Sequence, residues 1–245
     1  MNQIQANQLD ITFFVPCYNE EKNVTKTLNT IISAVNKTKL SFEIVVVDDK
    51  SEDLTNEIVK NYIDQNKSKN IILRENQFNL GLGRGYIDTA FFSRGEHYML
   101  VNGDNAEHEE TLLKLLNEVG KSDMIIPYFG SNDKDTRHFM RVNLSKAFTL
   151  LINFIGGYKI RYYNGPVIHK RFNVMRWSPD TYGFAYQAEI IVKVLDEKGT
   201  FQEVMIDNLD REEGSSKAFK IKNILAVSHS ILQILLRRLR KLLFY

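Results

Sequence analysis

Apolar runs alternate with amphipathic stretches along most of the chain. Six runs are four to six residues long, and the clearest, FEIVVVDD from residue 42, is continuous rather than alternating. A strand has a continuous apolar run when both of its faces are covered, as in a parallel sheet between two layers of helices. We therefore predict strands at residues 10–15, 42–47, 70–73, 97–101, 123–128 and 203–206.

The stretches between these runs repeat apolar residues at spacings of three and four, the period of one helix face. Val24, Leu28 and Ile31 define the first such face, and residues 54–62 define the second. Repeated alternation of strand and helix predicts an α/β fold with a mostly parallel, doubly wound sheet. Further helices are predicted from residue 81, after the acidic pair at residues 109 and 110, and through residues 148–155.

The last predicted helix, residues 221–243, is apolar on one side and basic on the other. Charges from Arg237 onward interrupt the roughly 20 apolar residues that a spanning helix needs, so we expect this amphipathic helical tail to lie in a membrane surface. Packing on the chain's own core or on a second subunit is the alternative, and a homo-oligomer remains open. We divide the chain into a domain of residues 1–217 and a tail of residues 218–245.

Composition and charge narrow the class of protein. A hydrophobic content of 43% and only four prolines exclude a disordered or low-complexity chain. Cys17 is the single cysteine and is expected to be a buried small residue, and no secretory leader is present, so we expect a reducing, cytoplasmic location. Residues 214–245 hold seven lysines and arginines and no acid. Such a tail indicates an anionic partner, and the lack of interleaved aromatics argues against nucleic acid.

Four predicted strands end in unusual polar clusters, at residues 15–21, 45–53, 75–85 and 101–105. Ligands of open α/β sheets bind at the carboxyl ends of strands, so these clusters are the first candidates for a site. Acidic side chains repel phosphate unless a hard divalent cation such as Mg²⁺ or Mn²⁺ intervenes. No dinucleotide fingerprint and no Walker loop are present. Asp48 and Asp49 alone would also suit ordinary helix-start chemistry.

Together these clusters resemble the family 2 glycosyltransferases, over about residues 11–217. VPCYNEE is similar to that family's VPxYNEE, VDDKSEDLT to its VDDGSxDxT, NLGLGRG to its glycine-rich stretch, and NGD to its DxD metal motif. The resemblance implies a GT-A fold, a nucleotide-sugar donor and a divalent metal held by Asp104. It also implies that the donor is bound by Pro16, Tyr18, Glu20, Asp48, Asp49, Ser51, Gly81, Arg84, Asn102 and Gly103.

Two positions depart from the family pattern. Lys50 replaces the glycine of the second motif, and Asn102 replaces the first aspartate of DxD. An amide oxygen is a weaker metal ligand than a carboxylate, so Asp104 must carry most of the coordination, or Glu107 contributes instead. A transferase-like subunit that has lost efficient metal binding and serves assembly is the corresponding alternative.

The C-terminal half is similar to the polyprenyl-phosphate glycosyltransferases, the group that includes dolichol-phosphate mannose synthase. The segments concerned are NGPVIHKR at 164–171, GFAYQAE at 183–189 and REEGSSK at 211–217. Guanidinium, ammonium and hydroxyl donors suit phosphates. The resemblance implies catalytic roles for Gln187, Glu189, Arg211 and Lys217, and the donor chemistry predicts contacts to the acceptor phosphate by Arg137, Arg141 and Ser216.

The chemistry of the acceptor determines whether the active site needs a general base. A hydroxyl acceptor needs a general base, whereas a lipid phosphate is already anionic and needs positioning. The segment WSPDTYGFAYQAE offers Asp180 and Glu189 but no adjacent acidic pair, which favours the phosphate. The prediction is an inverting transfer of a sugar from a UDP- or GDP-sugar to a polyprenyl-phosphate-type lipid at the inner face of a membrane. A hydroxyl-acceptor transferase with Asp180 or Glu189 as base is the runner-up.

Overall fold

The computed structural model describes residues 8–67, 70–130, 139–176, 183, 185–206 and 221–244, with the side chains of residues 139–141, 221–224, 241 and 242 left aside. One mixed sheet runs through the molecule in the order β3-β2-β1-β4-β6-β5-β7. Its pairs are parallel except those of β6 with β4 and β5. The strands are β1 (Leu9–Cys17), β2 (Phe42–Asp48), β3 (Ile71–Glu75), β4 (Gly95–Leu100), β5 (Met124–Phe129), β6 (Ile168–Lys170) and β7 (Phe201–Ile206).

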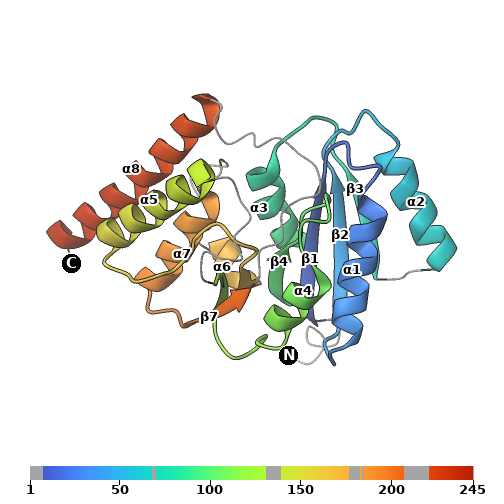
Figure 1. Cartoon of the computed structure of the whole chain (residues 1–245), viewed down its shortest axis with the longest axis horizontal. Helices are drawn as coiled ribbons and strands as arrows, with labels where there is room; N and C mark the ends of the chain where they lie inside the picture. Colours follow the sequence, from blue (N-terminus) through green and yellow to red (C-terminus); the bar gives the residue numbers. More distant parts are fainter. Residues whose placement is uncertain are drawn as a thin grey trace.

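Helices cover both faces of the sheet, as the continuous apolar runs predict (Figure 1). Along β1, Phe13 and Val15 pack with α1 and α4, whereas Phe14 points to the opposite face and packs with α3. The predicted α/β class with a mostly parallel sheet is therefore confirmed. The helices are α1 (Val24–Asn36), α2 (Thr55–Asn66), α3 (Leu82–Phe92), α4 (Glu109–Leu116), α5 (Phe139–Gly156), α6 (Arg171–Arg176), α7 (Tyr186–Asp196) and α8 (Ile221–Phe244).

All six predicted strands and all six predicted helices are present, with ends moved by a few residues. The strand β6 and the helices α6 and α7 were not predicted. β6 is three residues long, too short to show a period. α7 carries Glu189, Lys193 and Asp196 at spacings of four and three, a polar stripe typical of a helix, so the sequence held a signal that the prediction missed.

The order of the strands creates one topological switch point, between β1 and β4. The chain builds β1, β2 and β3 outward in one direction and then returns to place β4 on the other side of β1. The loops that leave β1 and β4 diverge at this point, where α/β sheets bind their ligands.

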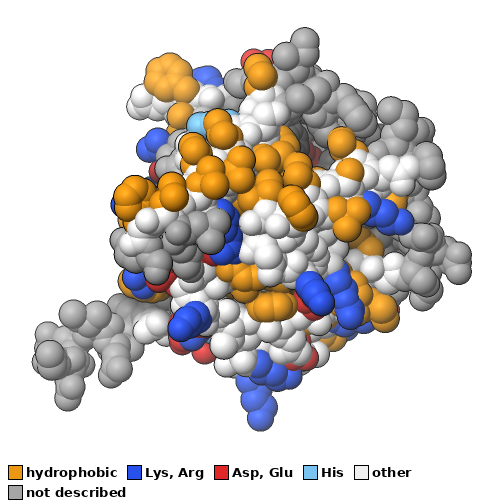
Figure 2. Space-filling model, turned by 90° about the vertical axis from the view of Figure 1, so that its left-hand side faces the viewer, with side chains coloured by type: hydrophobic (Ala, Val, Ile, Leu, Met, Phe, Trp, Pro, Cys, Tyr) orange, Lys and Arg blue, Asp and Glu red, His pale blue; other side chains and the backbone are white. Residues whose placement is uncertain are grey.

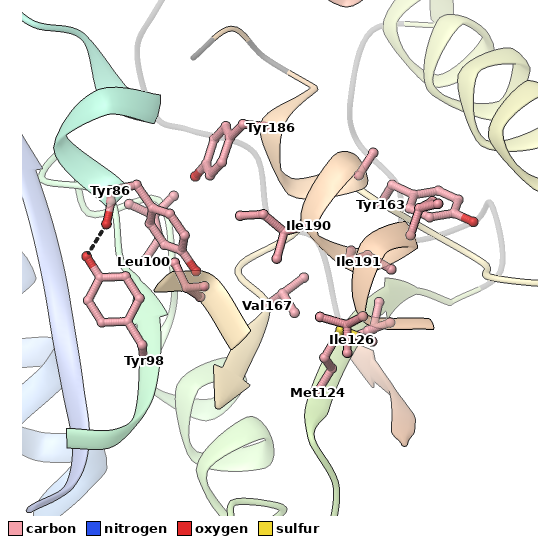
Figure 3. Packing of buried hydrophobic residues seen from close by; sticks show 14 of the residues in the cluster. Tyr86, Tyr98, Leu100, Met124, Ile126, Tyr163, Val167, Tyr186, Ile190 and Ile191 are labelled. Atoms are coloured by element: carbon pink, nitrogen blue, oxygen red, sulfur yellow. Dashed lines mark hydrogen bonds between the residues drawn. The ribbon is translucent and has the colours of Figure 1, made fainter. Parts of the chain in front are cut away.

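The core on the α3 side contains three tyrosines from different elements whose rings pack at a tilt (Figure 3). Tyr86 of α3 lies 4.8 Å from the ring of Tyr98 in β4 and 5.1 Å from that of Tyr186 in α7. The Tyr98 hydroxyl donates to the backbone carbonyl of Tyr86 at 2.8 Å. These contacts join α7, in the C-terminal half, to the switch-point strands.

The helix α8 is bound to the rest of the protein through Asp196 at the end of α7. One carboxylate oxygen of Asp196 accepts from Tyr158 and pairs with Arg238 at 2.9 Å, and the other accepts from Arg237 at 2.9 Å. In the described chain no helix combines the length and apolar content needed to cross a membrane. Arg237, which the sequence analysis placed on the basic side of the tail, and its neighbour Arg238 thus pair with Asp196 of α7.

Candidate functional site

The loops after β1 and β2 are joined by hydrogen bonds into one unit. The backbone N–H of Asn19 donates to the Ser51 hydroxyl at 3.0 Å, and the Asn19 side-chain oxygen accepts from the Glu52 backbone at 2.8 Å. The Glu20 N–H donates to Thr55 Oγ1 at 2.8 Å. The first two sequence motifs are therefore in contact, and Ser51 contributes by holding the first loop.

The two adjacent aspartates of the second motif have different partners. Asp48 accepts from the backbone N–H of Ser51 at 3.0 Å and from the Asn56 side chain at 3.1 Å. Asp49 accepts from the backbone N–H groups of Leu80 and Gly81, each at 2.8 Å. Asp49 thus places its negative charge at the start of α3, the position that an anion would otherwise occupy.

The contacts of Asp49 show the structural role of the glycine-rich segment, residues 79–85. Gly81 precedes α3 with a φ of 82°, a conformation that favours glycine, and its N–H is held by Asp49. Asn76 also donates to Asp49 at 2.8 Å, and Arg84 pairs with Asp88 one turn later in α3. In this structure Asp49 holds the first part of the segment, and the rest of the segment forms the first turn of α3.

Lys50 lies in the left-handed region, with a φ of 68°. That conformation explains why the resembled family has glycine here, because a side chain at this φ costs roughly 1–2 kcal/mol. The lysine is exposed. A strained residue with a positive charge therefore stands in the loop that carries the two aspartates.

The loop after β4 is pinned against the end of β1. The Val101 N–H donates to the carbonyl of Phe14 at 3.0 Å, and the Gly103 N–H donates to that of Pro16 at 3.3 Å. A Cβ at Gly103 would lie 2.8 Å from both Cys17 Sγ and the Pro16 oxygen. Only glycine fits here, so the NGD motif is held at the switch point by its middle residue.

Two threonines of α1 donate hydrogen bonds to the same loop. Thr27 donates to the Gly103 carbonyl at 3.0 Å, and Thr30 donates to the Asn105 side chain at 3.0 Å. The sequence analysis did not select either residue. A signal existed, because Thr27 is a polar residue within the apolar face that begins at Val24 and continues at Leu28.

The first residue of the NGD motif is paired with Glu107. The Glu107 carboxylate accepts from the Asn102 backbone N–H at 3.1 Å and from its side-chain NH₂ at 2.8 Å. Asp104, two residues further on, accepts from the Ala106 backbone at 3.2 Å. Both oxygens of Glu107 therefore hold Asn102, and Asp104 is the one carboxylate within the NGD motif.

Acidic side chains surround Cys17 at the switch point. Cys17 is buried there, as the sequence analysis expects, and burial together with the negative charges of Glu20, Asp48, Asp53 and Asp104 raises the pKa of its thiol. A thiol with a raised pKa is a poor nucleophile. The same charges would repel a diphosphate unless a cation were bound with it.

The donor set fits a magnesium or manganese ion shared with a substrate. Asp104 offers a carboxylate and Asn102 an amide oxygen, both hard ligands. Within the described part of the chain, no cluster of three or more His, Cys, Asp or Glu could enclose a metal. A cation bound here would take its remaining ligands from water and substrate phosphates, as magnesium commonly does.

The residues predicted in the C-terminal half fall into two sets. Gln187 is buried in α7 and accepts from the ring of buried His169 at 2.9 Å, and Glu189 is buried with an ion pair to Lys193 at 2.9 Å. Neither is exposed beside the NGD loop in this structure. Asp180, Arg137, Arg211, Ser216 and Lys217 lie outside the described residues, as does the side chain of Arg141.

Tyr18 and Pro16 complete the predicted donor residues. Tyr18 follows β1 with its side chain 41% exposed at the switch point, where a planar ring is available for stacking. Pro16 lies in β1, and its carbonyl holds Gly103. The structure thus brings the VPCYNEE, VDDKSEDLT and NGD motifs together. The glycine-rich segment contacts this group through the hydrogen bonds that Leu80 and Gly81 donate to Asp49.

Solved structures of sugar-transferring enzymes share this arrangement of the chain. Mannosyl-3-phosphoglycerate synthase from Rubrobacter xylanophilus superposes with a TM-score of 0.67 at 16% identity, covering 95% of this chain and 74% of that chain. Glucosyl-3-phosphoglycerate synthase from Mycobacterium tuberculosis, in complex with Mn²⁺, UDP and glucosyl-3-phosphoglycerate, has a TM-score of 0.63 at 14% identity and covers 94% and 80%. These likenesses define the fold as that of the GT-A class.

The sequence comparison gives the family. Residues 12–182 match the glycosyl transferase family 2 domain, so the chain belongs to that family. A dolichyl-phosphate beta-glucosyltransferase of Trichomonas vaginalis is 31% identical over 164 residues, covering 61% of this chain and 48% of the relative. One of Dictyostelium discoideum is 31% identical over 110 residues, covering 43% and 34%. The chain thus spans about half or less of the length of these curated relatives.

Proposed function

We propose that this glycosyltransferase moves a sugar, with inversion, from a nucleotide diphosphate sugar to a polyprenyl-phosphate-type lipid at the cytoplasmic face of a membrane. The observation that carries the proposal is that Asp48, at the end of β2, and the NGD loop, after β4, both lie against the end of β1 beside the switch point. The relatives named as dolichyl-phosphate glucosyltransferases support the acceptor class.

UDP is the nucleotide to test first. Solved structures of this fold hold UDP with Mn²⁺, and the TarS protein of S. aureus, 20% identical, holds UDP-GlcNAc. Asp104 and Asn102 would hold the cation, which supplies positive charge for the departing diphosphate. Arg211 and Lys217 are proposed to assist by hydrogen bonding to the same phosphates.

The acceptor phosphate attacks the anomeric carbon from the face opposite the diphosphate. The new carbon–oxygen bond forms as the bond to the diphosphate breaks, which inverts the configuration. No proton has to be removed from a phosphate near neutral pH. The burial of Glu189 and its ion pair with Lys193 argue against this residue as the base for a hydroxyl acceptor, because a general base must reach its proton.

A membrane surface is the partner proposed for the end of the molecule formed by α5 and α8. Hydrophobic side chains gather on this face (Figure 2). Phe154 and Leu150 of α5 are 87% and 69% exposed, and Leu243 of α8 is 74% exposed. The exposed bases Lys146 and Arg240 on the same two helices suit anionic headgroups. A lipid acceptor is reached only at such a surface.

The deciding experiment measures binding of UDP and of GDP to the full chain, by calorimetry, with Mn²⁺ and with EDTA. We expect metal-dependent binding of one nucleotide and transfer of its sugar to a short polyprenyl phosphate, giving a product that enters organic solvent. Asp104→Ala should abolish transfer and remove the metal-dependent part of binding. A folded wild-type protein that binds neither nucleotide would favour the assembly-subunit alternative instead.

A further inference from the structure

Glu107 makes two hydrogen bonds to one residue, Asn102. Its Oε2 accepts from the Asn102 backbone at 3.1 Å, and its Oε1 accepts from the Asn102 Nδ2 at 2.8 Å. Both residues are partly buried at the carboxyl end of β4. The side chain at the first position of NGD is thus held at both its backbone and its amide group.

The chemistry of an amide determines what this pairing leaves available. A primary amide donates through nitrogen and accepts through oxygen, so a carboxylate on the NH₂ leaves Oδ1 as the free acceptor. The hydrogen bond is charge-assisted and polarises the amide, which makes Oδ1 a better ligand than an isolated amide oxygen. An aspartate at position 102 could not donate, and two carboxylates at 2.8 Å would repel each other.

We propose that Glu107 is a positioning residue for the divalent cation, acting through Asn102. The amide and the glutamate form a pair that replaces the first carboxylate of DxD: Asn102 presents the oxygen, and Glu107 supplies the negative charge behind it. The inference rests on the proposed function and specifies how its metal site works despite the missing aspartate.

The first test compares Glu107→Gln with a matched control, Glu110→Gln, in the full chain. Glu110 is an exposed acid three residues further on, at the start of α4, so its replacement removes the same charge without touching Asn102. We expect Glu107→Gln to weaken Mn²⁺-dependent nucleotide binding about 10-fold or more, the usual effect of losing an outer-shell partner. Binding in EDTA and the melting temperature should stay close to wild type.

The second test exchanges the charge between the two positions. Asn102→Asp, which restores the DxD pattern, should fail to strengthen Mn²⁺ binding while Glu107 remains, because the two carboxylates oppose each other. The double variant Asn102→Asp with Glu107→Gln restores a donor facing the new aspartate. Its Mn²⁺ affinity should exceed that of either single variant, a coupling that a double-mutant cycle measures.

The outcomes separate this inference from the proposed function. Wild-type protein without metal-dependent nucleotide binding would overturn both. Wild-type binding with equal effects of the Glu107 and Glu110 variants would overturn the positioning role alone. Tighter Mn²⁺ binding by Asn102→Asp than by the double variant would also overturn it, since Glu107 would then be joining the metal rather than positioning its ligand.

Discussion

At the scale of single residues, the backbone conformation of the site loops determines which side chains fit without strain. Lys50 is the clearest case, because its φ of 68° suits glycine and the side chain adds strain. Lys50→Gly removes that strain but makes the unfolded chain more flexible, which offsets part of the gain. We expect a net increase of up to about 1 kcal/mol in the free energy of unfolding, measured by urea denaturation.

Lys50→Ala is the control for this prediction. Alanine removes the charge and the long side chain while keeping a Cβ at the same φ. An equal gain from alanine and glycine would assign the effect to charge in the loop rather than to backbone strain.

His169 provides a prediction of pH dependence at the same scale. Burial lowers its pKa to about 4, although the hydrogen bond to Gln187 acts in the opposite direction. The unfolded chain, with a histidine pKa near 6.5, therefore takes up a proton between pH 6.5 and about 4 that the folded protein does not. Stability conferred by neutral His169 is complete above pH 6.5 and falls as the pH drops towards 4.

The loss from this one group is about 3 kcal/mol. Urea denaturation at several pH values measures it, with His169→Gln as the comparison, since glutamine retains a donor and carries no titrating proton. The variant should show a shallower fall in stability across this range. Titration of the His169 ring near pH 6.5 in folded protein, followed by NMR, would contradict the prediction.

The secondary-structure elements show where sequence reasoning succeeded. Strands buried on both faces and helices with one apolar face have periods that the chain displays directly, so β1, β2, α1 and α4 could be predicted. The strand β6 is too short to show such a period, whereas α7 shows one in the spacing of Glu189, Lys193 and Asp196 and could have been predicted. Motif residues were found at the ends of predicted strands for the same reason, because strand ends are defined by the runs that precede them.

Hydrogen bonds between loops lay beyond that reasoning. Nothing in the spacing indicates that Asp49 holds the N–H groups before α3, or that Glu107 holds Asn102. These contacts depend on how two strand ends meet in space. The sequence therefore predicted which loops form the site, and the structure was needed to assign roles within them.

The attachment of α8 gives a prediction at the scale of elements. Asp196 is buried. It accepts hydrogen bonds from Tyr158 and Arg237 and forms an ion pair with Arg238. Asp196→Asn should lower the free energy of unfolding by roughly 2–4 kcal/mol, because it removes the buried carboxylate that pairs with Arg238 and the nearer of the two carboxylates that pair with Arg237. Limited proteolysis should then cleave near α8 sooner than in wild type.

Glu197 supplies the comparison for α8. Its carboxylate also pairs with Arg237, at 3.5 Å, but its side chain is 49% exposed. Glu197→Gln should change stability by less than about 1 kcal/mol, as exposed pairs do. Equal effects of the two variants would mean that Asp196 is not the anchor of the helix.

At the scale of the whole molecule, the face formed by α5 and α8 predicts binding to lipid vesicles. Phe154→Glu removes an 87% exposed aromatic ring from that face and adds a charge that anionic lipids repel. We expect the fraction of protein that sediments with phosphatidylserine-containing vesicles to fall at least several-fold, and wild-type binding to weaken with salt.

The matched variant is Phe78→Glu, which changes an equally large and 72% exposed ring in the loop before α3. It should leave vesicle binding close to wild type. A loss of the same size would show that binding follows total exposed apolar area rather than this face.

The short strand β6 has a consequence for how such proteins can diversify. Three residue pairs, from His97↔Lys170 to Met99↔Ile168, are all that join β1–β4 to the remaining strands within the sheet. Of the strands that the structure describes, β1–β4 precede residue 101 and β5–β7 follow residue 123. A chimaera of two relatives spliced between residues 101 and 123 would therefore have to preserve the β4–β6 pairing, the tyrosine cluster beside it, and the packing of α6 on α3 and of α4 on β7.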